Sequence, residues 1–152
     1  MLVREQITFS DLDGLGHLSA VSQQYEKTYR IVANWLETVK SGDPQKVADL
    51  YDEKAVLMGT VARNLKQGRS VIKTYFDSFL KKRPVGFLDS IIFQELGEDY
   101  AVADGNYTFE LDDKGGGRIR VPARFTFVVN VKTGLILTHH SSSNPGGQMT
   151  SI

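Results

Sequence analysis

The sequence predicts an α+β domain in which three amino-terminal helices pack on one face of a curved antiparallel sheet. In the first half of the chain, apolar residues recur every three or four positions, as they do along a helix that buries one side. In the second half, runs of Val, Ile, Phe, Tyr and Thr alternate with short turns, which is typical of strands. A length of 152 residues suits one such domain.

The first half of the chain predicts three helices and one short strand. A long amphipathic helix is expected over residues 22–40, and a short helix over 44–51 follows it after a tight corner. Residues 55–58 are all apolar and predict a short buried strand. A third helix follows Ser70, which we expect to cap it, and this helix ends before Pro84.

The second half predicts four strands, over residues 87–96, 100–111, 118–131 and 135–142. The separators between them are short, which favours an antiparallel meander. A strongly bent sheet around a long helix forms a cone, and a cone of this kind keeps an apolar hollow at its mouth. Concave apolar sites are where small ligands bind, so the hollow is the predicted binding site.

Composition argues against several functions. Eighteen basic and eighteen acidic residues give a net charge of zero, so neither nucleic acid nor an anionic membrane is an expected partner. The absence of cysteine removes disulfides and Cys-ligated metals, and the sequence has no phosphate-loop, dinucleotide, zinc-protease or serine-hydrolase motif. We therefore expect no cofactor and no metal.

The location of the protein is predicted from the first twenty residues. They contain four acidic or basic residues and no unbroken apolar stretch, so they do not resemble a secretory signal. This predicts a cytoplasmic protein, although a secreted protein whose signal had been removed would look the same. No apolar run approaches the length that spans a bilayer.

Two kinds of polar residue on the predicted strands are candidates for chemistry. His139 and His140 are neighbours, so their side chains point to opposite faces and cannot both bind one metal ion; one ring should face the hollow. Arg124 lies among aromatic residues in the middle of a strand. It either pairs with an interior carboxylate, for which Glu110 and Asp104 are plausible, or binds a planar anion in the hollow.

Two tyrosines, Tyr51 and Tyr107, are candidates for directing hydroxyl groups into the pocket. Most of the other aromatic residues at helical spacing are expected to be core. These assignments leave an Arg, His and Tyr lining for the predicted hollow.

Several segments together resemble the nuclear transport factor 2-like superfamily, which has a cystatin-like fold. The resemblance is specifically to small bacterial proteins similar to the calcium/calmodulin-dependent protein kinase II association domain, a group that overlaps the SgcJ/EcaC family. It covers residues 22–145, with 1–21 an amino-terminal extension and 146–152 a flexible tail. The segments that carry it are Trp35, Ser41-Gly42-Asp43-Pro44, Val47-Ala48-Asp49-Leu50-Tyr51, Gly105-Asn106-Tyr107-Thr108-Phe109, Ala123-Arg124-Phe125-Thr126-Phe127-Val128 and His139-His140-Ser141-Ser142-Ser143-Asn144-Pro145.

The resemblance implies a cone-shaped fold that forms a homodimer or a higher homo-oligomer. In the kinase association domain, arginines line a deep pocket. Arg124 matches one of them, whereas Tyr107 and Ser141 stand at positions similar to two others. The pocket of this chain is therefore expected to be less cationic, and no kinase accompanies it.

The leading functional hypothesis is a small-molecule-binding and oligomerisation domain, with little or no catalysis. Its pocket would hold a small polar or aromatic molecule through Arg124, His140, Tyr51, Tyr107 and Ser142.

The alternative is a cofactor-free lyase, isomerase or cyclase, as the ketosteroid isomerases and SnoaL-like cyclases of the same superfamily imply. It would act on a carbonyl, polyketide-like substrate, with His140 abstracting a proton and Tyr107 or Tyr51 steadying the oxyanion. A third possibility is assembly alone, through the outer face of the last three strands.

Overall fold

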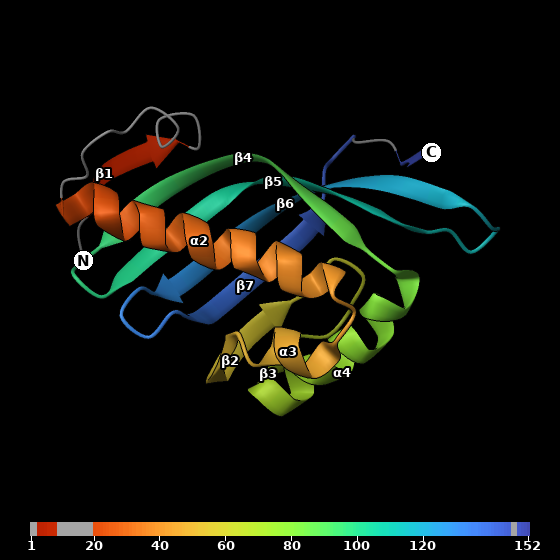
Figure 1. Ribbon diagram of the computed structural model, residues 1–152, viewed down its shortest axis with the longest axis horizontal. Coiled ribbons are helices and arrows are strands. Elements are labelled where there is room, and N and C mark those ends of the chain that lie inside the picture. The colour runs from red at the N-terminus through yellow and green to blue at the C-terminus, as the bar shows by residue number, and fades with distance from the viewer. Residues whose placement is uncertain (1–2, 9–19, 147–148) are drawn as a thin grey trace.

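The computed structural model describes residues 3–8, 20–146 and 149–152, and it confirms the α+β architecture. A long helix lies across the concave face of a curved sheet, and two shorter helices pack at one end of it (Figure 1). The helices are α2 (Ala20–Lys40), α3 (Pro44–Ala48) and α4 (Arg69–Phe79), the last continued by a 3-10 turn, Leu80–Lys82.

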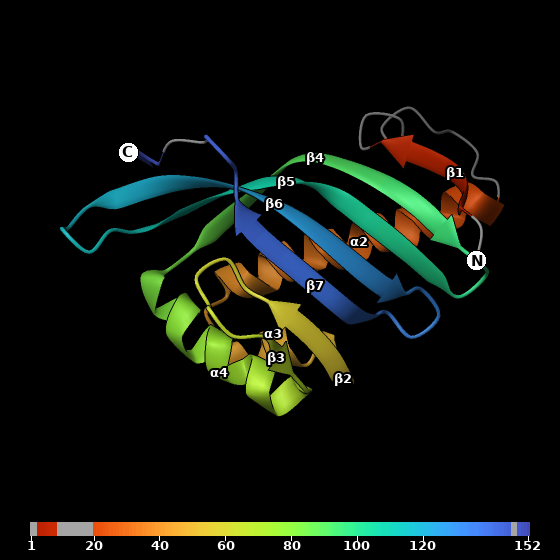
Figure 2. The ribbon, with the colours of Figure 1, turned by 180° about the vertical axis from the view of Figure 1, so that it is seen from behind.

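The sheet has the strand order β1-β4-β5-β6-β7-β2-β3, and β8 pairs with β6 beside this path. The strands from β4 to β7 form the predicted antiparallel meander, whereas β2 pairs with β7 in parallel. Seen from behind (Figure 2), β4 to β7 present the face opposite α2. The strands are β1 (Val3–Thr8), β2 (Tyr51–Met58), β3 (Lys66–Gln67), β4 (Val85–Leu96), β5 (Tyr100–Asp112), β6 (Arg118–Asn130), β7 (Leu135–Ser143) and β8 (Thr150–Ser151).

The structure differs from the sequence prediction at several local points. Strands β1 and β8 fall in segments expected to be an extension and a flexible tail, and β3 is a short strand that the sequence pattern does not predict. Tyr51 begins a strand instead of ending a helix. The expected cap at Ser70 is wrong, because α4 begins after Gly68, whose φ of 93° suits glycine and which provides no side-chain cap.

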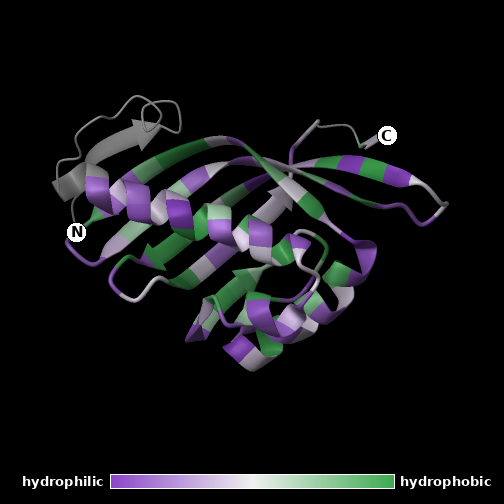
Figure 3. Cartoon of the chain, in the orientation of Figure 1, coloured by the Kyte–Doolittle hydropathy of each residue, from purple (hydrophilic) through white to green (hydrophobic). Residues whose placement is uncertain are grey.

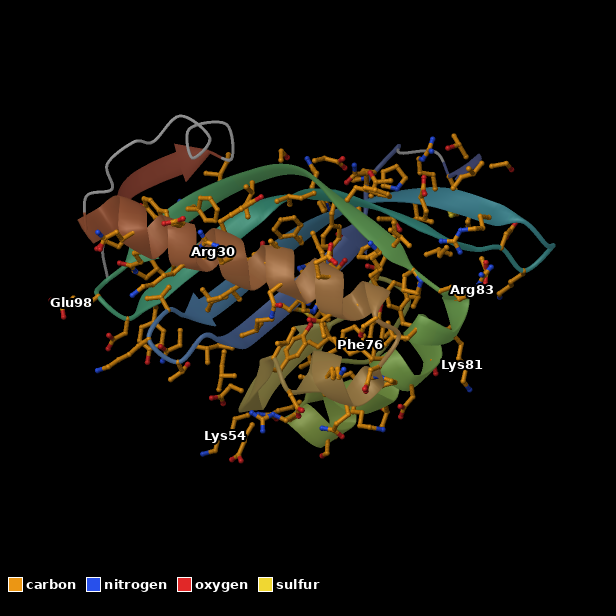
Figure 4. The ribbon with its side chains drawn as sticks, in the orientation of Figure 1. Arg30, Lys54, Phe76, Lys81, Arg83 and Glu98 are labelled. Carbon is orange, nitrogen blue, oxygen red and sulfur yellow. The ribbon has the colours of Figure 1, made fainter. Side chains whose placement is uncertain are left out.

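The core lies between α2 and the concave face of the sheet. Helix α2 buries Tyr25, Val32, Trp35 and Val39, and the strands bury alternate residues against them. Figure 3 shows hydrophobic and hydrophilic residues alternating along α2 and the strands. In Figure 4 Phe76 points from α4 into this core. None of the described helices combines the length and apolar character needed to cross a membrane.

A close contact between backbones fixes the bend of β4 against β5. The pairing register of β4 shifts between Leu88 and Ser90, and Gly105 of β5 lies beside this bulge. A Cβ atom at Gly105 would stand 2.0 Å from the carbonyl oxygen of Ser90 and 2.8 Å from the ring of Phe125. Glycine is therefore required here by space, since the Ser90 oxygen belongs to the main chain and cannot swing away.

Replacing Gly105 with alanine should destabilise the protein by about 1–3 kcal/mol, because the bulge must move to admit a methyl group. Chemical denaturation would measure the loss. The matched control is Gly115→Ala, where a Cβ would meet nothing nearer than 4.0 Å and where we expect a change within about 0.5 kcal/mol. Equal effects at the two positions would contradict the assignment of strain to the bulge.

Candidate functional site

Five side chains from four elements converge in the interior of the cone. Trp35 comes from α2, Tyr51 from β2, Tyr107 from β5, and His139 and Ser141 from β7. All five are buried. His139 and Ser141 share a face because side chains two apart on a strand point the same way.

The polar atoms of these residues form a continuous chain of hydrogen bonds. Trp35 Nε1 donates to the Tyr51 hydroxyl at 3.0 Å, and this hydroxyl lies 2.7 Å from His139 Nδ1. On the other side of the ring, His139 Nε2 lies 3.2 Å from the Tyr107 hydroxyl, which donates to Ser141 Oγ at 2.6 Å. Ser141 Oγ in turn lies 2.5 Å from Thr60 Oγ1 in the segment after β2.

The direction of this chain follows from Trp35. An indole N–H only donates, so the Tyr51 oxygen accepts from it and the Tyr51 hydrogen is left for His139 Nδ1. The hydrogen of neutral His139 then lies on Nε2 and is donated to Tyr107, which matches the donation from Tyr107 to Ser141. The last hydrogen bond joins the hydroxyls of Ser141 and Thr60, and either of them can be its donor. Reversing the chain would leave the Tyr51 hydrogen buried without an acceptor, which is costly.

Burial determines the protonation states of the histidine and the two tyrosines in this series of hydrogen bonds. Desolvation, together with a smaller electrostatic effect of nearby His140, lowers the pKa of His139 from 6.5 to about 3, so the ring is neutral at neutral pH. Burial also raises the pKa of Tyr51 and of Tyr107 well above the ordinary value for tyrosine. The two phenols therefore stay protonated, as the direction of the chain requires.

The series of hydrogen bonds ends at a small recess between α4, the segment after β2 and the inner face of the sheet. Its cavity volume is about 10 Å³, which is room for one water molecule. Thr60, His139 and Ser141 provide its polar wall. The rest is mainly aromatic, from Trp35, Tyr75, Phe76, Phe79, Tyr107 and Phe109.

Tyr75 closes the outer side of the recess. Its ring lies against Gly59, where a Cβ atom would stand only 2.3 Å from the ring, and it stacks on Phe79 with 5.7 Å between ring centroids. Burial raises the pKa of Tyr75 to about 12, against an opposing effect of backbone hydrogen bonds with Val61 and Thr60. Space for anything larger than water therefore requires a lining side chain such as Tyr75 to move.

The structure brings only two of the expected site residues into the interior. Tyr51 and Tyr107 lie there, but Arg124 and His140 are exposed on the outer face of the sheet, with the half-buried Ser142 beside Arg124. The expectation that Arg124 and His140 face the hollow is therefore wrong. Neighbouring side chains on a strand point to opposite faces, so either His139 or His140 can face the interior. In the structure it is His139, and no local sequence signal distinguishes the two orientations of β7.

The expected partners of Arg124 are also wrong. Arg124 Nε donates to Ser142 Oγ at 3.1 Å. Glu110 instead pairs with Arg120 at 2.8 Å, and Asp104 accepts a hydrogen bond from Thr126. Each of these contacts joins neighbouring strands across the outer face.

Metal ligation has no geometric support in the described part of the chain. No group of three or more His, Asp or Glu side chains gathers there in a way that could hold an ion. The interior histidine has both ring nitrogens in hydrogen bonds with tyrosines.

The long helix on a bent meander, with a polar cluster inside the cone, defines the class of nuclear transport factor 2-like proteins with a cystatin-like fold. The family model for the calcium/calmodulin-dependent protein kinase II association domain matches residues 24–145. The chain belongs to that family.

Solved structures agree with this assignment. A putative calcium/calmodulin-dependent protein kinase II association domain from Xanthomonas campestris is 39% identical, with a TM-score of 0.74 over 79% of this chain and 87% of that one. The epoxide hydrolase/cyclase-like enzyme SalBIII of salinomycin pyran-ring formation is 18% identical, with a TM-score of 0.68 over 86% and 99% of the two chains. A cystatin-like protein from Novosphingobium aromaticivorans is also 18% identical, with a TM-score of 0.64 over 84% and 86%. Among curated proteins, none matches this chain by sequence.

His139 should make stability depend on pH. The folded chain binds a proton at this ring only near pH 3, whereas the unfolded chain binds one below pH 6.5. The unfolded state therefore holds more protons in this window, and the free energy of unfolding should fall as pH drops from 6.5 to 3. Denaturation of His139→Gln should start from a lower stability, because hydrogen bonds are lost, but should lack this part of the decline.

The control for this measurement is His140→Gln, which removes the exposed neighbour and should keep nearly the wild-type decline. Carboxylates such as Asp112, whose pKa Arg83 holds down at about 2, contribute equally to all three proteins. Parallel stability curves for wild type and His139→Gln would show that the histidine is not held neutral by the fold.

Proposed function

We propose that this protein is a non-catalytic or weakly catalytic domain that binds a small molecule in the interior recess and associates with copies of itself. The observation that carries the binding proposal is the chain of buried hydrogen bonds that ends at the recess wall. Burying so many polar groups among aromatic side chains costs stability unless every one of them is hydrogen-bonded. The series of hydrogen bonds ends at the hydroxyl groups of Ser141 and Thr60, which line the recess.

Binding fits the geometry better than catalysis does. A lyase or isomerase needs a base with a free lone pair near the substrate. His139 Nδ1 already accepts the Tyr51 hydrogen, and burial holds the pKa of this ring at about 3, so it is a weak base at neutral pH. His140, the base expected from the sequence, faces away from the recess. The cyclase-like alternative therefore has less support than binding.

Trp35 gives a direct readout of ligand binding, because it is the only tryptophan in the chain and it lines the recess. A panel of small polar and aromatic compounds should contain ligands that change Trp35 emission. Ser141→Ala should weaken their binding by roughly tenfold, since a hydrogen-bonding wall group is lost. Ser142→Ala, one residue away on the outer face, is the matched control and should bind as the wild type does. The opposite pattern would move the site to the outer face.

The outer face of the sheet supports self-association. It exposes Phe87 and Ile92 on β4 and Met58 on β2, which are 48%, 43% and 36% exposed. The pairing register places Met58, His140 and Ile92 in one row across β2, β7 and β4. Protein interfaces bury exposed apolar side chains of this kind in their core and place polar residues around them. The family is an association domain, and a two-fold pairing through this face would bury them.

Ile92→Lys should therefore lower the oligomeric state, because it places two charges in a two-fold interface. Light scattering coupled to size exclusion at micromolar protein would show the change. Val71→Lys is the control, because Val71 is 42% exposed but lies on α4, away from the outer face. A monomeric wild type, or dissociation by the control alone, would contradict the proposal.

A further inference from the structure

The direction of the hydrogen-bond chain determines what kind of polar atom the recess can recognise. Every group from Trp35 to Tyr107 has its hydrogen committed to the next group in this series of hydrogen bonds. The hydroxyls of Ser141 and Thr60 share one hydrogen bond in which either can donate, so one of their two hydrogens is left without an acceptor among the described residues. Thr60 is half-buried at the edge of the recess. The recess thus offers a hydrogen-bond donor, and its natural partner is an acceptor oxygen.

The charge of the recess restricts that acceptor further. Among the described residues, no lysine or arginine lines it, and Arg124, the expected cation, lies on the outer face. His139 is hydrogen-bonded as a neutral ring. A carboxylate entering the recess would give up its hydration without gaining a counter-ion, which is strongly unfavourable, whereas a neutral carbonyl loses much less.

The apolar wall restricts the rest of the ligand. Tyr75, Phe79 and Phe76 form a run of aromatic contacts along α4, with Tyr75 stacked on Phe79 and edge-on to Phe76. The ring of Tyr75 fills the space over Gly59 and closes the recess. A flat ring of similar size would make the same stacking contact if it took the place of the Tyr75 ring.

We propose that Ser141 donates to Thr60 and that the recess binds a small, uncharged aromatic carbonyl compound, whose oxygen accepts the Thr60 hydrogen and whose ring replaces that of Tyr75 against Phe79. This inference rests on the proposed function, because it names the ligand class of the same site. Tyr75 is then a displaceable plug, and the recess volume of about 10 Å³ is that of the closed form.

The test compares four probes of similar size, with Trp35 emission and calorimetry as readouts. Acetophenone is a neutral acceptor, benzoate an anionic acceptor, benzylamine a cationic donor, and ethylbenzene has no polar atom. Acetophenone should bind most tightly to the full chain. Thr60→Val should weaken its binding by roughly 3- to 10-fold, and Thr60→Ser, which keeps the hydroxyl, should restore it.

A second variant keeps the result interpretable if the plug opens rarely. Tyr75→Ala removes the ring and should bind acetophenone more tightly than wild type does, with the same preference over benzoate. Benzoate binding more tightly than acetophenone, or equal affinities in Thr60→Val and Thr60→Ser, would overturn the ligand class while leaving small-molecule binding intact. If no probe or other small compound changes Trp35 emission in wild type or Tyr75→Ala, the proposed function fails as well.

Discussion

The interior of this domain depends on keeping every polar group around His139 hydrogen-bonded. Trp35 can only donate, and this one constraint fixes the direction of each later bond through Tyr51, His139 and Tyr107. The groups therefore act as a unit, and a change at one position alters what its neighbours can donate or accept. The same direction of hydrogen bonding requires His139 to be neutral. A neutral, fully hydrogen-bonded ring is better suited to holding the interior in place than to acting as a general base.

One short stretch of β7 serves two surfaces. His139 and Ser141 complete the interior series of hydrogen bonds, whereas His140 and Ser142 lie on the outer face that we propose for self-association. The two surfaces are separated only by the thickness of a strand. The charge of His140 already lowers the pKa of His139 through this short distance, although burial is the larger cause. A change of charge at His140 on the outer face would therefore alter the pKa of His139 in the interior.

The recess differs from the arginine-lined pocket that the resemblance to the kinase association domain implies. Its walls are aromatic, its polar groups are hydroxyls and a neutral imidazole, and Arg124 is committed to Ser142 on the other side of the sheet. Recognition by hydroxyl donors in an apolar recess favours neutral acceptors, because no charge is available to offset the desolvation of an anion. Family membership fixes the scaffold here, and the lining residues fix what it can hold.

The sequence by itself determined the α+β class, the long helix α2 and the four strands of the meander, because each is encoded in a local repeat of apolar residues. It also identified Tyr51 and Tyr107 as interior candidates. Only the tertiary structure decided which of His139 and His140 faces inwards. A strand pattern is equally regular in either register, and the choice is made by long-range packing against Trp35 and by the parallel pairing of β2 with β7, neither of which a local window contains.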